Sequence, residues 1–282
     1  MKKICFLSCQ SLEGHIIDDT LATSELEKDG DYKVTSIPWD DEVDWKDFDL
    51  VITRTTWDYH KRPAEFVAKL KHISSQVRLL NSVEVVEWNF HKGYLKELEA
   101  KGAKIVPTEM FKLPGKITVP ASWDYKKFIV KPAISANAYK TIIVKLEDLN
   151  SEAIINQLHA GDWMLQPFME EITQGEVSLH FFNKKFSHGI LKVPKPGDFR
   201  VQEEHGGLIS PFVPDAQLLI DATSLVEKVP FDLLFARVDV VNWGGTYVLM
   251  EIELIEPALY FRTSSQSVKN FKAALDKIFT NP

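Results

Sequence analysis

The stretch that decides the fold is Ala236-Arg237-Val238-Asp239-Val240-Val241-Asn242-Trp243-Gly244-Gly245-Thr246-Tyr247-Val248-Leu249-Met250-Glu251-Ile252-Glu253-Leu254. Both flanks alternate with a period of two, which predicts half-buried strands, and Asn-Trp-Gly-Gly is a turn signal. The hairpin would set Asp239 roughly opposite Glu251, with Glu253 on the same face and Met250 on the other. Such crowded carboxylates repel one another unless a cation lies between them. A hard divalent ion such as Mg²⁺, bridging to phosphates, satisfies oxygen ligands of this kind. The alternative is a solvated acidic strand face.

Composition narrows the class of protein. The chain has 282 residues, is 45% hydrophobic and carries a formal net charge of −7. That length suits a large core with two or three subdomains. The acidic balance, without a basic stripe, argues against nucleic acid as a partner. No run approaches the ~20 apolar residues of a membrane span, and the apolar part of the N-terminus is too short for a signal peptide. Cys5 and Cys9 lack metal or redox spacing, so we expect buried thiols in a reducing cytoplasm.

Several familiar catalytic signatures are missing from the sequence. It contains no His-x-x-x-His pair, no Gly-x-x-x-x-Gly-Lys-Ser/Thr loop, no Gly-x-Gly-x-x-Gly and no Gly-x-Ser-x-Gly. These absences disfavour a zinc hydrolase, a P-loop enzyme, a dinucleotide oxidoreductase and an α/β-hydrolase.

The chain divides into four predicted segments. Residues 1–82 alternate strands (3–8, 32–38, 50–54, 78–80) with helices (16–28, 63–74), which favours a parallel sheet. Residues 83–112 form a linking segment that begins with a helix over 83–101. Residues 113–170 mix short strands with a helix at 151–159. Residues 171–282 hold a mainly antiparallel sheet, a helix at 215–228 and a C-terminal helical stripe. The fold class is therefore α/β in the α+β sense.

Two lysines are candidates for binding phosphate. Lys131 ends the apolar strand Lys127-Phe128-Ile129-Val130-Lys131, where it can reach into a cleft. The small residues that follow, 133–141 with Ser135 among them, can bring backbone N–H groups close to phosphate oxygens. Lys92 lies on the linking helix. The ordinary alternatives are a strand-terminal lysine beside a surface loop, and a solvated helical lysine.

A second group follows an apolar strand. Gln166, Pro167, Phe168 and Met169 precede Glu176 and could offer a backbone N–H and C=O to a planar base, with apolar contact from Phe168 and Met169. The alternative is a plain connection between subdomains.

Arg200 lies in Gly197-Asp198-Phe199-Arg200-Val201-Gln202, a turn-rich stretch before Gly206-Gly207, and Lys192 precedes it on a strand. The planar fork of arginine suits phosphate oxygens. By itself, Arg200 is equally consistent with a surface charge.

The predicted substrate residues come after a strand of the first segment. Ligands of open α/β sheets lie outside the carboxyl ends of the strands, which makes Arg54, Thr56, Trp57 and Tyr59 candidate contacts, with Arg54 gripping a carboxylate. Arg262 is a further candidate. Trp57 and Tyr59 could instead pack at a domain junction, and Arg262 could pair with a nearby acid.

In this order, the motifs resemble the ATP-grasp superfamily of carboxylate–amine ligases. The resemblance covers nearly the whole chain and is strongest to the D-cycloserine ligase branch. Glutathione synthetases and ribosomal-protein glutamate ligases are more distantly similar. It implies an N-terminal pre-ATP-grasp domain (1–82), a linking segment (83–112), a lid (113–170) that closes over the reaction, and a C-terminal core with the metal site (171–282).

The resemblance also implies roles for the candidate residues. Those matching nucleotide-binding positions are Lys92, Lys131, Ser135, Gln166, Pro167, Phe168, Met169, Glu176 and Lys192. Arg200, in a Phe-Arg-x-Gln segment before Gly-Gly, would stand beside the γ-phosphate as the catalytic residue. Asp239, Glu251 and Glu253 would bind Mg²⁺. The chain departs from the family in two places: Glu253 replaces the usual asparagine, and the phosphate loop between Lys131 and Thr141 has no glycine.

The function these features predict is an ATP- and Mg²⁺-dependent ligase with one or two ions, Mn²⁺ being an acceptable substitute. It would join the carboxylate of a small amino-acid-like substrate to a nitrogen nucleophile through an acylphosphate, with ring closure included. The alternatives are a nucleotide-binding module without turnover and a small-molecule kinase. The expected partner is a small carboxylic or amino acid, and the expected assembly is a monomer or homodimer.

Overall fold

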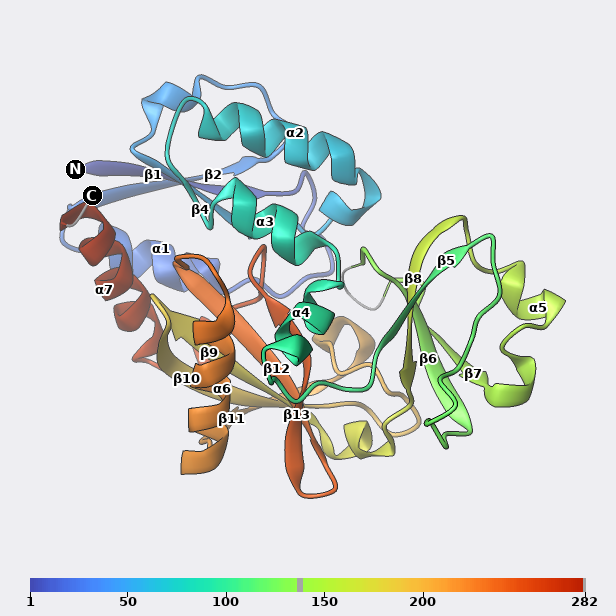
Figure 1. Ribbon diagram of the computed structural model, residues 1–282. Helices are drawn as coiled ribbons and strands as arrows, with labels where there is room; N and C mark the ends of the chain where they lie inside the picture. Colours follow the sequence, from blue (N-terminus) through green and yellow to red (C-terminus); the bar gives the residue numbers. More distant parts are fainter. Residues whose placement is uncertain (136–138, 281–282) are drawn as a thin grey trace.

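The computed structural model describes residues 1–135 and 139–280. Ala136, Asn137 and Ala138, which belong to the predicted phosphate loop, lie outside the described residues. Three sheets with flanking helices make up the described fold (Figure 1). The mixed α/β class expected from the sequence is confirmed.

The N-terminal unit is a parallel sheet of order β2-β1-β3-β4 with helices packed against it. Its elements are β1 Lys2–Ser8, α1 Asp19–Glu27, β2 Tyr32–Pro38, β3 Leu50–Thr55, α2 Pro63–Ser74 and β4 Leu79–Leu80, with short 3₁₀ helices η1 Trp45–Asp47 and η2 Tyr59–Lys61. The alternation of strands and helices therefore predicted this sheet correctly. Helix α1 begins three residues later than expected, and the carboxylate of the preceding Asp18 accepts a hydrogen bond from the backbone N–H of Arg262 (3.0 Å).

The linking segment contains two helices, α3 Val83–Phe90 and α4 Tyr94–Ala100, where one helix over 83–101 was predicted. The break lies at His91–Gly93. There the backbone N–H of Lys92 donates to the carbonyl of Ala133 (2.9 Å), so it makes no helical bond. The His91 ring accepts from the N–H of Gly93 (3.1 Å). This break brings Lys92 next to the segment that follows Lys131.

The lid is a separate antiparallel sheet of order β5-β8-β6-β7. Its elements are β5 Glu109–Leu113, β6 Lys127–Pro132, β7 Ile142–Lys145, η3 Leu146–Asp148, α5 Glu152–Ile155 and β8 Gly161–Pro167. Strand β5 pairs with β8, so the lid sheet starts inside the stretch assigned to the linking segment. The helix predicted at 151–159 is only one turn long. The lid core contains Phe128 and Trp163, both fully buried.

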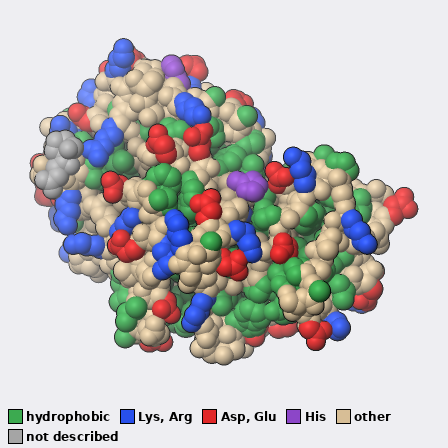
Figure 2. Space-filling model, viewed as in Figure 1, with side chains coloured by type: hydrophobic (Ala, Val, Ile, Leu, Met, Phe, Trp, Pro, Cys, Tyr) green, Lys and Arg blue, Asp and Glu red, His purple; other side chains and the backbone are tan. Residues whose placement is uncertain are grey.

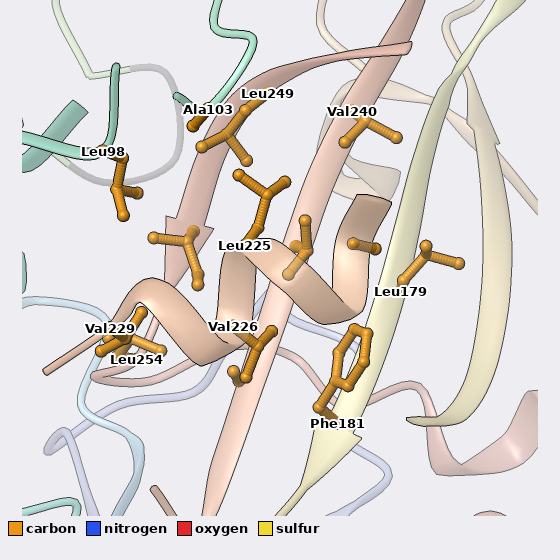
Figure 3. Packing of buried hydrophobic residues seen from close by; sticks show 14 of the residues in the cluster. Leu98, Ala103, Leu179, Phe181, Leu225, Val226, Val229, Val240, Leu249 and Leu254 are labelled. Carbon is orange, nitrogen blue, oxygen red and sulfur yellow. The ribbon is translucent and has the colours of Figure 1, made fainter. Parts of the chain in front are cut away.

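The C-terminal unit is a sheet of order β11-β10-β9-β12-β13. Its elements are η4 Glu170–Gln174, β9 Glu176–Phe182, β10 Lys185–Val193, η5 Glu203–His205, β11 Leu208–Phe212, α6 Ala216–Lys228, β12 Phe235–Trp243, β13 Thr246–Glu253, η6 Phe261–Thr263 and α7 Ser267–Thr280. Helix α6 places Leu225 and Val226 on the apolar face formed by β9, β12 and β13 (Figure 3).

The C-terminal helix joins this unit to the N-terminal one. Helix α7 contacts α1, and Phe271 shares a buried cluster with Phe6 of β1 and Phe182 of β9. Strand β1 and helix α7 therefore lie near each other in Figure 1. On the face shown in Figure 2, acidic and basic side chains are interspersed. None of the described helices is both long and apolar enough to cross a membrane.

Candidate active site between the three sheets

The acidic hairpin forms with the expected register. Asp239 on β12 pairs with Glu251 on β13, and one oxygen from each of Asp239, Glu251 and Glu253 lies within 4.8 Å of the others. The register shifts directly after Asp239, because Val240 pairs with Leu249. This bulge leaves Met250 without a partner on β12, and Met250 lines the cleft, whereas simple alternation predicted that it faces away.

Strand β13 is the edge strand of its sheet, and the linking helices fix it from outside. The Asn89 amide donates to the carbonyl of Ile252 (2.8 Å), and its oxygen accepts from the N–H of Leu254 (3.0 Å). The Tyr94 hydroxyl accepts from the N–H of Ile252 (3.1 Å). An edge strand otherwise presents unpaired backbone groups. These bonds hold Glu251 and Glu253 in place, and sequence reasoning did not predict them.

Each carboxylate of the cluster has a basic partner. Lys92 donates to Glu251 (2.5 Å), which connects the linking segment to β13. Arg237 makes three contacts to Asp239 (2.9, 3.0 and 3.2 Å) and also pairs with Glu253. Arg237 was missed as a site residue, although its position two residues before Asp239 puts it on the same face of β12.

Lys192 on β10 lies between two carboxylates. It pairs with Glu176 on β9 and approaches Asp239 (3.3 Å). The Ser178 hydroxyl, also on β9, donates to Asp239 (2.5 Å). Lys192 and Glu176 were both predicted from the sequence as nucleotide contacts, and the structure places them beside the predicted metal ligands.

The electrostatics of the cluster follow from burial and from these partners. Burial alone would raise the pKa of Glu251, but Lys92 and Lys131 hold it well below its usual range. Burial raises the pKa of Glu253 to about 8; Arg237 opposes this rise, and repulsion from Glu251 and Asp239 adds to it. Burial lowers the pKa of Lys131 to about 8. Burial therefore disfavours the charged forms of Glu253 and Lys131, whereas the neighbouring lysines favour the ionised form of Glu251.

The donor set fits a divalent cation. Three carboxylates in close contact provide the hard oxygen ligands that Mg²⁺ prefers. A cation among these carboxylates would favour the ionised form of Glu253, which burial disfavours. Asp239, Glu251 and Glu253 are thus the residues able to hold the ion.

The predicted nucleotide residues all border the same cleft. Its lining includes Lys92, Lys131, Ser135, Gln166, Pro167, Phe168, Met169, Glu176 and Lys192. The Gln166 side chain is buried and donates to the hydroxyl of Thr108 (2.9 Å). The backbone N–H of Phe168 donates to the carbonyl of Lys127 (2.9 Å), so this amide is not available to a base.

Arg200 also lines the cleft, but its guanidinium is already held by a neighbour. Its Nε and Nη2 donate to the Asp198 carboxylate (3.0 and 2.7 Å), and 38% of the side chain is exposed. Arg200 lowers the pKa of Asp198 well below its usual range. A phosphate contact would therefore require Arg200 to share or exchange this partner.

The predicted substrate residues separate into two groups. Trp57 and Tyr59 line the cleft. Arg54 and Thr56 are not part of its lining: Arg54 is buried with 1% exposure, and it bonds Asp19 (2.9 Å) and the carbonyl of Pro257 (3.2 Å). Arg54 therefore links β3 to α1 and to the segment after β13, because a fully buried guanidinium needs a carboxylate partner.

Arg262 also lies outside the cleft lining. It pairs with Asp18 (3.3 Å) and Glu203, and so connects the loop before α1 to η5. These contacts agree with the alternative prediction, in which Arg262 pairs with a nearby acidic side chain and does not contact substrate.

Comparison with known proteins places this fold. The crystal structure of D-cycloserine synthetase DcsG superposes with a TM-score of 0.87 at 23% identity, covering 98% of this chain and 99% of that one. D-alanine–D-alanine ligase from Bacillus anthracis, complexed with ATP, gives 0.69 at 13% identity, covering 99% and 97%. The ATP-grasp ligase PsnB, complexed with a minimal precursor, gives 0.67 at 12%, covering 99% of each chain. The fold is that of the ATP-grasp ligases.

Sequence comparison identifies the branch. The family model for the N-terminal domain of D-cycloserine synthetase DcsG matches residues 4–81. Cycloserine biosynthesis protein DcsG from Streptomyces lavendulae is 30% identical over 263 residues, covering 84% of this chain and 86% of the relative. The chain belongs to the DcsG family of ATP-grasp ligases.

Proposed function

We propose that this protein uses ATP and Mg²⁺ to join the carboxyl group of a small amino-acid-like substrate to a nitrogen nucleophile, with release of ADP and phosphate. The observation that carries the proposal is the group of three carboxylates within 4.8 Å, surrounded by basic side chains from several elements in one cleft. The cycloserine role printed for the relative supports a ring-closing version, in which nucleophile and carboxyl group belong to one molecule.

The chemistry explains why such a site is needed. A carboxylate is a poor electrophile because its leaving group would be oxide. Transfer of the γ-phosphoryl group of ATP to the carboxylate gives an acylphosphate, from which the nitrogen displaces phosphate. Phosphoryl transfer depends on positioning and charge neutralisation. Mg²⁺, held by Asp239, Glu251 and Glu253, would neutralise charge on the phosphates.

The chain's own basic residues complete the charge balance. Lys92, Lys131 and Lys192 approach the cleft from the linking segment, the lid and β10 respectively. In our proposal Lys92 and Lys131 bind phosphate oxygens, and Arg200 stabilises the charge that develops on the transferred phosphoryl group. The lid, which carries Lys131 and Gln166, closes over the cleft and excludes water, which would otherwise hydrolyse the acylphosphate.

Asp239→Asn tests the proposal. The variant should lose Mg²⁺-dependent turnover, because an amide replaces an ionised ligand, while circular dichroism stays that of the wild type. Both proteins are incubated with ATP, Mg²⁺ and a panel of amino acids, and ADP, phosphate and phosphoester are quantified. Asp124→Asn, at a carboxylate whose side chain is 98% exposed, is the matched control.

The products separate the proposed function from the others. ADP with free phosphate and a new amide supports a ligase, and ADP with a stable phosphoester indicates a kinase. ATP binding without turnover indicates a nucleotide-binding module. Wild-type turnover in Asp239→Asn would remove this residue from the metal site.

A further inference from the structure

Glu256 follows strand β13, which carries Glu251 and Glu253, and it faces the cleft. It lies in Leu254-Ile255-Glu256-Pro257, is 8% exposed and belongs to the lining of the cleft. Its oxygens are not part of the group of three carboxylates that could hold a metal among the described residues. Glu256 is therefore a separate acidic feature of the site.

The backbone around Glu256 is fixed by side chains on or just after β3. The Thr53 hydroxyl donates to the carbonyl of Ile255 (2.5 Å), the Trp57 indole donates to the carbonyl of Glu256 (3.0 Å), and Arg54 donates to that of Pro257 (3.2 Å). Three consecutive carbonyls are thus held by the N-terminal unit. Such anchoring presents the Glu256 side chain in a defined position.

Glu256 differs from the other buried carboxylates in its partners. Asp239, Glu251, Glu253 and Glu176 each pair with a lysine or arginine. No described residue of the chain forms a hydrogen bond or ion pair with the carboxylate of Glu256, whereas Lys92, Lys192 and Arg237 pair with the other four. Burial, with added repulsion from Glu253, raises its pKa well above the usual range. A buried carboxylate without a partner is strongly unfavourable.

The walls beside Glu256 suit a small cation. Trp57 and Tyr59 line the same cleft. Burial raises the pKa of the Tyr59 phenol, and Glu256 is the charged neighbour that raises it most. An ammonium group next to a carboxylate and aromatic rings gains both charge pairing and cation–π attraction.

We propose that Glu256 is the specificity residue that binds the ammonium group of the amino-acid-like substrate, beside Trp57 and Tyr59. This inference rests on the proposed ligase function, since it names the group of the substrate that the cleft recognises. It explains why a carboxylate is held unpaired at a rigid position next to the metal ligands. Acids without an ammonium group should bind poorly, because they would leave Glu256 buried and unpaired.

Binding measurements test this inference without requiring turnover. The probes are the standard amino acids in both configurations, together with lactate and glycerate, which carry hydroxyl where alanine and serine carry ammonium. Calorimetry is done with Mg²⁺ and a non-hydrolysable ATP analogue. We expect amino acids to bind at least about 10-fold more tightly than the hydroxy acids, and Glu256→Gln to weaken amino-acid binding about 10- to 100-fold.

Three further readouts control the experiment. Glu256→Gln should bind the ATP analogue as the wild type does and should resist urea at least equally well, because a neutral amide replaces a buried acid without a partner. Glu256→Asp should restore part of the amino-acid affinity. Glu42→Gln, at a side chain that is 86% exposed, should change nothing.

The outcomes that overturn the inference differ from those that overturn the ligase function. Equal binding of hydroxy acids and amino acids, unchanged amino-acid binding in Glu256→Gln, or loss of Mg²⁺ and nucleotide binding in that variant would each overturn the role of Glu256. Glu256-dependent amino-acid binding in a protein that forms no amide would retain the subsite and refute the ligase function alone.

Discussion

Two stacked histidines behind the active site should make the fold sensitive to acid. His180 on β9 and His188 on β10 lie face to face, with ring centroids 4.2 Å apart and planes inclined by 6°. His188 donates from Nε2 to the carbonyl of Leu259 (2.9 Å). The groups that face His180 are Arg237 across the strand pair and Tyr260 at its ring edge, and neither supplies negative charge at neutral pH.

The sign of the effect follows from the direction of the pKa shifts. Burial lowers the pKa of His188 from 6.5 to about 4 and lowers that of His180 well below 6.5, with His188 and Arg237 adding to it. Between these values the unfolded chain binds more protons than the folded one, so stability falls as the pH drops through 6.5 towards 4. For His188 alone, the loss between pH 7.5 and 5.5 is about 1.3 kcal/mol.

His188→Gln isolates this contribution. Glutamine keeps a donor for the Leu259 carbonyl but does not titrate. The free energy of unfolding is measured by urea denaturation at pH 7.5 and 5.5, and the acid-induced loss should be smaller in the variant by about 1.3 kcal/mol. His72→Gln, at an exposed position of α2, should show the wild-type loss. An acid-induced loss in His188→Gln equal to that of the wild type would refute the argument from burial.

Three other substitutions test the site and its support. Arg200→Ala should lower kcat about 100-fold while changing ATP affinity little, and an unchanged kcat at saturating ATP would contradict its role. Gly175→Ala should lower the free energy of unfolding, measured in urea, by about 1–3 kcal/mol. The reason is that Gly175 has φ +116° and that a Cβ there would lie 2.7 Å from Leu191 Cδ1. Unchanged stability would refute this steric argument. Asn89→Ala should cost about 2–4 kcal/mol, since two buried backbone groups of β13 lose their partner, and amide exchange that stays slow in β13 would contradict this.

The features predicted correctly from the sequence are those with a local cause. Period-two alternation fixed the strands, and with the Gly-Gly turn it gave the register of Asp239 with Glu251. The parallel N-terminal sheet followed from the alternation of strands and helices. The roles of the individual residues in catalysis and nucleotide binding stay predictions.

The features that were missed depend on contacts distant in the sequence. The break in the linking helix arises because the backbone N–H of Lys92 bonds the carbonyl of Ala133, about forty positions away. The helix propensities of residues 91–93 do not predict this bond. The sequence predicts Arg54 as a substrate contact because it ends a strand, but its bonds to Asp19 and to the carbonyl of Pro257 hold it inside the core. Glu256 was passed over because its significance lies in the partners that it lacks, which only a folded structure reveals.

The contacts also indicate which part of the molecule moves. The N-terminal and C-terminal units share a buried cluster, and side chains from β3 hold the three carbonyls around Glu256. Most buried residues of the lid instead form a cluster of their own, and Met164 of β8 is the one that packs into the core of the C-terminal unit. A unit with its own core moves more readily than units that share one. We therefore expect the predicted metal ligands and Glu256 to form one rigid platform, and the lid to be the part that moves relative to it.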